Sequence, residues 1–460
     1  MPRHNALPAA PLRRSTVLLK HWRFTSSAAV LCVSLAGCAS APRPEPPAQT
    51  LAKVQPPGAI ERPAEPPAPP TPTPTPTITP SAPVDQERAG FARWIETFRQ
   101  EALQAGISPP TVASALDGAQ LLPQVIELDR SQPEFTRPPW AYLDTAVSAV
   151  RIQQGRAKLA EHRSALESAA SRYGVPAEII TAIWGMESNY GAHFGSFRTV
   201  DSLATLAYEG RRSDWARSEL MAALRIIDQG DIAADRMVGS WAGAMGHTQF
   251  LPSVFLAYAV DADGDGHRDI WGSIPDVIAS TANFLSRMGW RTGRPWGVEV
   301  RLPSGFDYER AELAVRHPST QWAADGVQSI DGQPLPELDA ASILVPAGSR
   351  GPVFLVGPNF RAILRYNNST NYALGVGLLA RQIGGGPGVS APWPRDLQPL
   401  TRAQTKDLQD ALNTKGFAVG TADGVMGPAT RMGLRRYQQS VGLVADGYPT
   451  LDLLQRVLAP

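Results

Sequence analysis

A single carboxylate at the end of an apolar helix is the first candidate for chemistry in this chain. In the stretch 174–191, Pro176, two residues after Gly174, indicates a helix start, and Gly191 indicates its stop. Glu187 lies four positions beyond Ile183, so it projects from the apolar face of this helix near its C-terminal end. Desolvation and the negative end of the helix dipole both raise the pKa of such a carboxyl. A carboxyl that stays neutral near pH 7 is what a general acid requires.

A second stretch, residues 239–253, combines small residues with hydrogen-bonding side chains. Its glycines and alanines allow the backbone to approach a ligand closely. Ser240 and Gln249 can exchange hydrogen bonds with sugar hydroxyls or amides. Taken separately, each stretch also has a structural explanation. Glu187 can reach water from the edge of its apolar stripe, and residues 239–253 can be a turn before a helix.

An acidic loop follows at residues 261–276. Aspartates occupy loop positions 1, 3 and 5 and Gly266 occupies position 6, as at the start of an EF-hand calcium loop. Position 12 is Gly272 rather than glutamate, so the closing carboxylate comes later. The pattern predicts a structural Ca²⁺ site, because closely spaced aspartates repel one another without a cation; an acidic turn with Asx capping is the alternative. The predicted ligands are Asp261, Asp263, Asp265, the backbone carbonyl of His267, and Asp276.

The elements that must position these residues are mainly helical. Apolar residues at helical spacing predict helices at 91–98, 111–116, 142–174, 177–188, 200–208, 215–227, 279–285 and 372–382. Residues 296–356 are instead rich in Gly, Pro and short β-branched runs, such as 298–300 and 353–356. We therefore expect a mainly α fold with a small β-containing insertion at 296–356.

The N-terminus predicts export and lipid attachment. Residues 1–37 combine basic residues with a short apolar run, which is too short to span a bilayer. The run ends in Leu-Ala-Gly-Cys at 35–38, which resembles a bacterial lipobox and predicts acylation of Cys38; a coincidental cysteine after an ordinary signal peptide is the alternative. The residue after Cys38 is Ala39 and not an aspartate. By the sorting habit of diderm bacteria, this implies the periplasmic face of the outer membrane.

Residues 38–87 form a predicted tether dominated by Pro, Ala, Thr and Glu. This composition cannot bury a core, and proline stiffens it towards polyproline II. At about 3.1 Å per residue it can extend on the order of 140 Å. The net charge of +1 offers no global basic field, so nucleic acid is not an expected partner.

Three blocks in order resemble the membrane-bound lytic transglycosylase B family. They read G-x-E-S-x-Y-G at 185–191, A-G-A-M-G-x-x-Q-F-x-P-S at 242–253 and R-Y-N-x-S-x-x-Y-A at 365–373. The resemblance covers roughly 90–385 and implies a lysozyme-like helical core within a catalytic domain at 88–385. It also implies an enzyme that acts on peptidoglycan glycan strands.

The resemblance implies roles for individual residues. Glu187 matches the catalytic acid/base of the family. The matching substrate contacts are Ser240, Gln249, Tyr366, Asn367 and Tyr372. Arg211 and Arg212 resemble a pair that grips carboxylates of the lactyl group or stem peptide, with a solvated basic turn as the alternative.

The implied reaction needs only one enzyme carboxylate. The substrate's 2-acetamido oxygen can attack C1, so an external nucleophile is dispensable, as in other substrate-assisted exceptions to the two-carboxylate rule. The expected reaction cleaves the β-1,4 bond between MurNAc and GlcNAc and leaves 1,6-anhydro-MurNAc ends. Two alternatives remain: a muramidase that uses water, which requires a second carboxylate, and a non-catalytic wall-binding lipoprotein.

The C-terminal residues 397–460 follow a predicted linker at 386–396, which overlaps a glycine-rich run at 384–388. Asp-Gly turns at 423–424 and 446–447 separate amphipathic helical segments. The pattern resembles the small three-helix peptidoglycan-binding domain, and a helical dimerisation module is the alternative. Such a domain raises the local concentration of an attached enzyme on its polymer.

Overall fold

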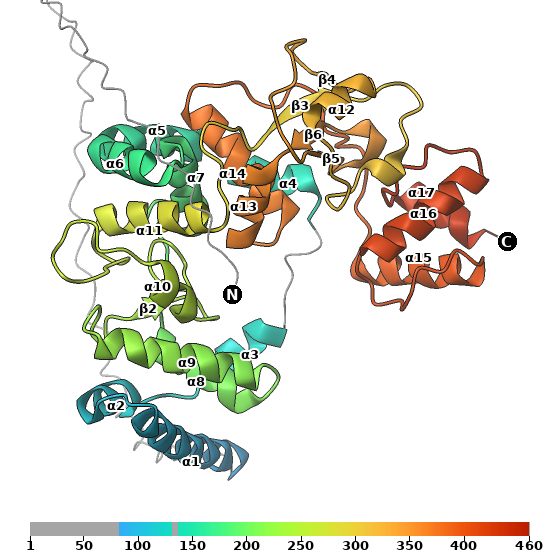
Figure 1. The fold of residues 1–460 in the computed structure, drawn as a ribbon. Coiled ribbons are helices and arrows are strands. Elements are labelled where there is room, and N and C mark those ends of the chain that lie inside the picture. The colour runs from blue at the N-terminus through green and yellow to red at the C-terminus, as the bar shows by residue number, and fades with distance from the viewer. Residues whose placement is uncertain (1–81, 131–136, 460) are drawn as a thin grey trace, which may run out of the picture. The chain divides into compact units, whose positions relative to one another are not determined.

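The structure, a computed structural model, describes residues 82–130 and 137–459 (Figure 1). The predicted signal segment at 1–37, Cys38 and most of the tether at 38–87 lie outside these residues. Within the described ranges, no helix has both the length and the apolar character needed to cross a membrane.

Helices dominate the described chain. Those preceding the acidic loop are α1 (Ala82–Gln104), α2 (Pro109–Leu116), α3 (Pro123–Arg130), α4 (Pro139–Ala146), α5 (Ala149–Glu161), α6 (Arg163–Tyr173), α7 (Ala177–Ser188), α8 (Thr199–Glu209), α9 (Ser213–Asp228) and α10 (Pro252–Tyr258). Those following it are α11 (Ile274–Arg287), α12 (Ser319–Ala324), α13 (Pro358–Tyr366), α14 (Thr370–Ile383), α15 (Arg402–Thr414), α16 (Pro428–Ser440) and α17 (Leu451–Leu458). The predicted mainly α fold is confirmed.

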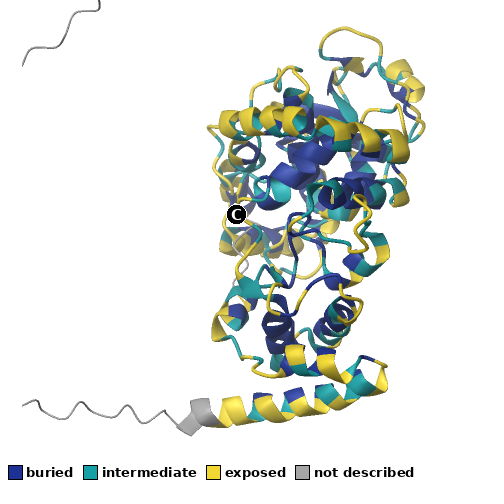
Figure 2. Ribbon diagram, turned by 90° about the vertical axis from the view of Figure 1, so that its left-hand side faces the viewer, coloured by how far each residue is buried: buried dark blue, intermediate teal, exposed yellow. Residues whose placement is uncertain are grey.

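The main hydrophobic core is built around α7. Helices α5, α6, α11 and α14 all pack against it, and Ile180, Ile183 and Trp184 are almost fully buried. Figure 2 shows buried residues gathered on the inner helices, with exposed residues on the outer faces. Because α7 is surrounded by other helices, its position is set by packing on several sides.

The single helix expected over 142–174 is wrong: the chain forms α4, α5 and α6 there. Ser148 adopts an extended conformation between α4 and α5, and its hydroxyl caps α5 by accepting the N–H of Arg151 at 3.4 Å. His162 separates α5 from α6, and Gly174 ends α6 in the left-handed conformation. Capping of this kind offers backbone groups an alternative to a continuous helix, which apolar periodicity alone does not reveal.

The β-containing insertion is confirmed as a four-stranded antiparallel sheet with strand order β4-β3-β6-β5. The strands are β3 (Gly297–Arg301), β4 (Gln328–Ser329), β5 (Ser342–Leu344) and β6 (Val353–Val356). Val298 pairs with Leu355 at the centre. The sheet has its own apolar cluster, which includes the fully buried Trp322. A second, two-stranded sheet joins β1 (Phe197–Arg198) to β2 (Val238–Gly239).

Helices α15, α16 and α17 enclose a separate apolar cluster that contains Leu408, Leu412 and Leu434. Helix α15 begins with a capping box between Thr401 and Gln404. The predicted three-helix C-terminal domain is confirmed.

Candidate active site

Glu187 is the penultimate residue of α7, as its sequence position predicts. The helix stops because Asn189 and Tyr190 adopt left-handed backbone angles, with φ of 48° and 58°. The Tyr190 hydroxyl donates to the backbone carbonyl of Arg151 at 2.8 Å, which ties this turn to α5. The turn therefore holds the end of α7, and with it Glu187, in a defined place.

The carboxyl of Glu187 retains some surface but is densely surrounded by protein. Burial raises its pKa to about 7, from an ordinary value of 4.5. The Tyr372 hydroxyl donates to Oε1 of Glu187 at 2.5 Å, and this bond lowers the pKa because it stabilises the carboxylate. Desolvation outweighs the hydrogen bond, so the predicted elevation of the Glu187 pKa is confirmed. No other acidic side chain in the described ranges contributes to this pKa.

Two tyrosines from the third sequence block lie beside Glu187. Tyr372 is buried in the first turn of α14, which Ser369 caps. Tyr366 ends α13, and its hydroxyl donates to the backbone carbonyl of Thr248 at 2.6 Å. Burial and the nearby Glu187 raise the pKa of both tyrosines well above the ordinary range. Both phenols are therefore neutral donors at physiological pH.

The loop at 239–250 comes close to this group through Thr248. Gly239 has no room for a side chain, because a Cβ there meets the carbonyl oxygen of Ala244 at 2.1 Å. The Ser240 hydroxyl accepts the N–H of Ala244 at 3.1 Å and keeps its own hydrogen available. The Gln249 amide nitrogen donates to the carbonyls of Phe194 and Gly246, at 3.0 and 2.9 Å. Both amide hydrogens of Gln249 thus bind backbone.

His247 joins this loop to α7, a role that the sequence analysis missed. The Trp184 indole donates to Nδ1 of His247 at 3.0 Å, and the imidazole stacks against both Trp184 and Phe194. Burial lowers the pKa of His247, which favours the neutral form that accepts this bond. A Cβ at Gly191 meets the imidazole at 2.2 Å, so this glycine makes the packing possible.

Tyr142 is a further aromatic residue near the site that no sequence motif indicated. It lies on α4, with a ring carbon 3.5 Å from the position that a Cβ on Gly375 would take. Its phenol interacts electrostatically with Tyr372. The same Gly375 position lies 3.1 Å from the Met186 methyl, directly before Glu187 in sequence.

The other predicted substrate contacts form no hydrogen bond with this group within the described residues. Asn367 is exposed at the C-cap of α13. Arg211 and Arg212 both pair with the buried carboxylate of Asp129, and the Arg212 guanidinium lies 4.6 Å from the Trp215 ring centroid. Both arginines thus already face a carboxylate of this chain, and their contact with substrate stays a prediction.

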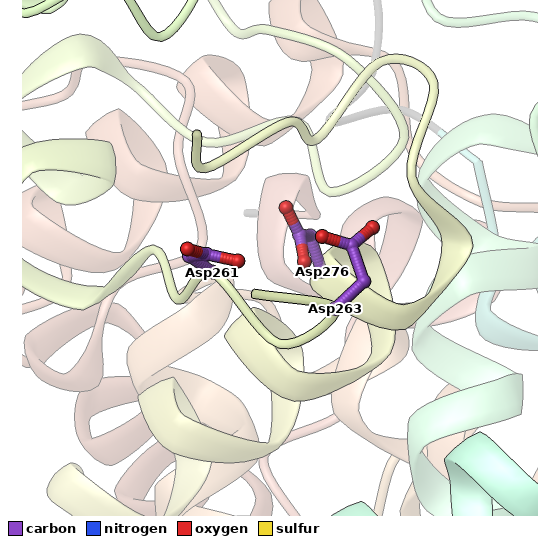
Figure 3. Close-up of side chains that lie close together, drawn as sticks. All are labelled: Asp261, Asp263 and Asp276. Atoms are coloured by element: carbon purple, nitrogen blue, oxygen red, sulfur yellow. The ribbon is translucent and has the colours of Figure 1, made fainter. Parts of the chain in front are cut away.

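In the acidic loop, Asp261, Asp263 and Asp276 converge (Figure 3), with ligand oxygens within 4.8 Å of one another. Asp276 is fully buried in the first turn of α11, and it accepts the N–H groups of Ala262 and Asp269 at 2.7 and 2.8 Å. Desolvation is the main cause that raises its pKa, and nearby Asp263 adds to it. Three convergent carboxylate oxygens suit a hard cation.

The predicted ligand Asp265 does not belong to this convergent group. The carboxylate of Asp265 accepts the N–H of His267 at 2.8 Å, so its oxygens turn towards the loop backbone.

Comparisons with known proteins agree with this geometry. The family profile described as "Transglycosylase SLT domain" matches residues 90–381, and "Putative peptidoglycan binding domain" matches residues 401–457. The membrane-bound lytic murein transglycosylase B of Escherichia coli K12 is 33% identical over 294 residues, which cover 60% of this chain and 79% of the relative.

Solved structures extend the similarity. SltB3 of Pseudomonas aeruginosa, in complex with NAG-anhNAM-pentapeptide, is 53% identical with a TM-score of 0.78, covering 80% of this chain and 99% of that chain. Lytic transglycosylase Slt35 of Escherichia coli, in complex with calcium, is 31% identical with a TM-score of 0.55, covering 65% and 93%.

Proposed function

The chain belongs to the transglycosylase SLT family, and on this premise we propose that Glu187 is the sole acid/base of a lytic transglycosylase. The enzyme cleaves the β-1,4 bond between MurNAc and GlcNAc of peptidoglycan and leaves 1,6-anhydro-MurNAc ends. The observation that carries the residue assignment is the isolated carboxyl of Glu187, whose pKa burial raises to about 7.

The first half of the reaction uses the protonated form of Glu187. The carboxyl donates its proton to the glycosidic oxygen that leaves MurNAc C1, while the 2-acetamido oxygen of the same sugar bonds to C1. The GlcNAc end departs as an alcohol, and Glu187 becomes a carboxylate. A pKa of about 7 keeps the acid protonated in a large share of molecules at neutral pH and still makes it an effective proton donor.

The second half uses the carboxylate as a base. Glu187 takes the proton of the C6 hydroxyl, whose oxygen bonds to C1 and displaces the acetamido oxygen. The 1,6-anhydro ring closes, the acetamido group is restored, and Glu187 regains its proton. No water is consumed.

Neighbouring side chains divide the supporting roles. The Tyr372 hydroxyl stabilises the carboxylate that exists between the two proton transfers, because it donates to Oε1 at 2.5 Å. In the part of the chain that the structure describes, the Ser240 hydroxyl hydrogen and the Asn367 side-chain amide bind no other group, so either can orient the acetamido group. Gln249 supports the loop and offers its amide oxygen to the sugar.

Intact sacculi provide the decisive test. Wild-type protein is expected to release 1,6-anhydro-muropeptides, and the Glu187→Gln variant is expected to release almost none, as measured by mass spectrometry. Products heavier by one water identify a muramidase. Absence of products from wild type, with binding retained, identifies a non-catalytic wall-binding protein.

Attachment to the wall and to a membrane involves the two ends of the chain. The C-terminal domain binds peptidoglycan. Acylated Cys38 holds the enzyme on the periplasmic face of the outer membrane, and the tether at 38–87 spans the distance to the glycan strands. The lipobox at 35–38 supports this assignment. Palmitate incorporation into wild type but not into Cys38→Ala tests it, and labelling of both proteins refutes it.

The acidic loop binds a structural Ca²⁺. Asp261, Asp263 and Asp276 supply convergent oxygens. The backbone carbonyl of His267 and the carboxylate of Asp265, after a rotation of its side chain, complete the ligands of the ion. Fully buried Asp276 supports the assignment, because a desolvated carboxyl beside other carboxylates is stabilised by a cation. When bound, the ion would neutralise these charges and fix the start of α11.

A further inference from the structure

The segment that joins the two folded domains is held along its length. Glu299, almost fully buried on β3, accepts the backbone N–H of Ser390 at 2.9 Å and that of Ala391 at 2.7 Å. Arg381 of α14 donates to the carbonyl of Gly388 at 2.8 Å. A buried carboxylate that accepts backbone N–H groups makes strong, charge-assisted hydrogen bonds. The predicted linker at 386–396 is therefore fixed at its beginning rather than free.

Further along this segment, Trp393 and Arg395 contact helix α4. The ring of Trp393 packs against the buried Trp140, with centroids 6.5 Å apart. The Arg395 guanidinium then grips Asp144 with two bonds, at 2.6 and 2.7 Å. Trp140 and Asp144 are four residues apart, so they occupy one face of α4.

Other residues of α4 face the catalytic group. Leu143 and Ala146 are buried, and α4 packs against α14, the helix that carries Tyr372. The Tyr142 ring lies beside Gly375, one turn along α14 from Tyr372. A displacement of α4 therefore changes the packing directly behind the Tyr372–Glu187 bond.

Helix α4 is too short to hold its place alone. It has eight residues, fewer than an isolated helix needs for stability in water, so tertiary packing determines its position. The contacts from Trp393 and Arg395 supply part of that packing.

We propose that residues 388–395 act as a strap that sets the position of α4, and that Trp393 and Arg395 are positioning residues for transglycosylation. The strap bridges α14 and α4, and so holds Tyr142 and Tyr372 in register. This inference rests on the proposed function, since the register matters only if Glu187 and Tyr372 carry out the reaction. The segment thus has a catalytic task besides connecting the wall-binding domain.

The test uses the full chain and a short soluble glycan that carries pentapeptides, which does not depend on tethering to the wall. Trp393→Ala and Arg395→Ala are expected to lower kcat at least about tenfold with little change in KM, because small misplacements of catalytic groups have large rate effects. The fall of kcat at alkaline pH is expected to begin at lower pH than in wild type. Loosened packing lets water reach Glu187, and this hydration lowers its pKa.

Arg350→Ala is the matched control. Arg350 binds Asp396, the residue directly after the strap, with bonds at 2.9 and 3.0 Å. That pair is as exposed as the pair of Arg395 with Asp144, but it does not touch α4. Arg350→Ala is expected to leave kcat unchanged. A charge exchange, Asp144→Arg with Arg395→Asp, is expected to restore kcat.

Two outcomes overturn the strap. One is unchanged kcat in Trp393→Ala and Arg395→Ala while wild type is active, with or without weaker sacculus binding. The other is an equal loss in Arg350→Ala, which indicates general destabilisation. Absence of anhydro products from wild type instead refutes the proposed function, so the two failures are distinguishable.

Discussion

Glu187 and Asp276 both carry desolvated carboxyls at helix ends, but their neighbours differ. Those of Glu187 favour a protonated carboxyl, and those of Asp276 favour a carboxylate bound to a cation. Glu187 lies at the C-terminal end of α7, where the helix dipole disfavours negative charge. Its hydrogen bond with Tyr372 lowers its pKa. Asp276 lies in the first turn of α11, where the dipole favours negative charge, and it accepts two backbone N–H groups. Burial raises both pKa values.

The surroundings decide how each carboxyl is neutralised. Near Glu187 no acidic neighbour contributes within the described residues, so a proton suffices and can be given away. Asp276 faces Asp261 and Asp263, so one proton leaves the group negatively charged, and a divalent cation suits it better. Burial alone therefore does not identify a catalytic acid; the partners do.

The largest effect is expected on catalysis, when the Glu187 carboxyl is replaced. Glu187→Gln is expected to lower kcat about 100- to 10,000-fold, the usual contribution of a general acid or base. Release of anhydro-muropeptides from sacculi measures the loss. Asp276→Asn, assayed with calcium in excess, is the control and is expected to retain far more activity. Equal activity of Glu187→Gln and wild type contradicts the assignment.

The second prediction concerns stability against pH. The Glu187 pKa is 4.5 ordinarily and about 7 when folded. Its contribution is thus fully present below pH 4.5 and is lost as pH rises through about 7, a change of about 3 kcal/mol. Glu187→Gln avoids this loss, so it is expected to be more stable than wild type at pH 8 but not at pH 4.

Urea unfolding of both proteins at the two pH values measures this difference. A stability difference that does not change with pH shows that the carboxyl is not desolvated in solution.

The third prediction concerns the acidic loop. Removing Ca²⁺ with a chelator is expected to lower the thermal midpoint, because a ligand present at a hundredfold excess over Kd stabilises by ~2.7 kcal/mol. Asp263→Asn is expected to weaken this effect more than Asp265→Asn, since only Asp263 belongs to the convergent group. Calorimetry with and without calcium tests the order, and an unchanged midpoint in wild type refutes the site.

The smallest effect is expected for Tyr372→Phe. Loss of the 2.5 Å bond to Glu187 is expected to lower kcat about tenfold, ~1.4 kcal/mol, because the carboxylate intermediate loses a donor. The fall of kcat at alkaline pH is expected to begin at higher pH than in wild type. The bond with Tyr372 lowers the Glu187 pKa, so its loss raises that pKa. Tyr366→Phe is the control, because its hydroxyl bonds Thr248; an equal displacement of this fall in both variants contradicts the assignment.

Local sequence patterns predicted much of this molecule. The apolar stripe that ends at Glu187, the Asp-Gly turns of the C-terminal domain and the β-branched runs near 298 and 353 depend on neighbouring residues, and each appears as expected in α7, α15–α17 and the four-stranded sheet. The ordered blocks at 185, 242 and 365 also indicated the family, because catalytic chemistry restricts residue type and spacing together.

Other features did not follow from apolar periodicity. The break of 142–174 into three helices rests on local capping that competes with a longer helix. The contact of Tyr142 with α14, the pairing of Arg211 with Asp129 and the strap held by Glu299 join residues far apart in sequence. No periodicity or spacing encodes such partners.

Residue order predicts the place of Glu187 near the end of an apolar helix, because that follows from helical periodicity, and the three ordered blocks single it out as the candidate acid. The extent of the rise in the Glu187 pKa, to about 7, and the donor Tyr372 on another helix come from the folded structure. Desolvation and hydrogen bonding depend on atoms that folding brings together from α7, α13 and α14, and the order of residues along the chain does not specify their distances.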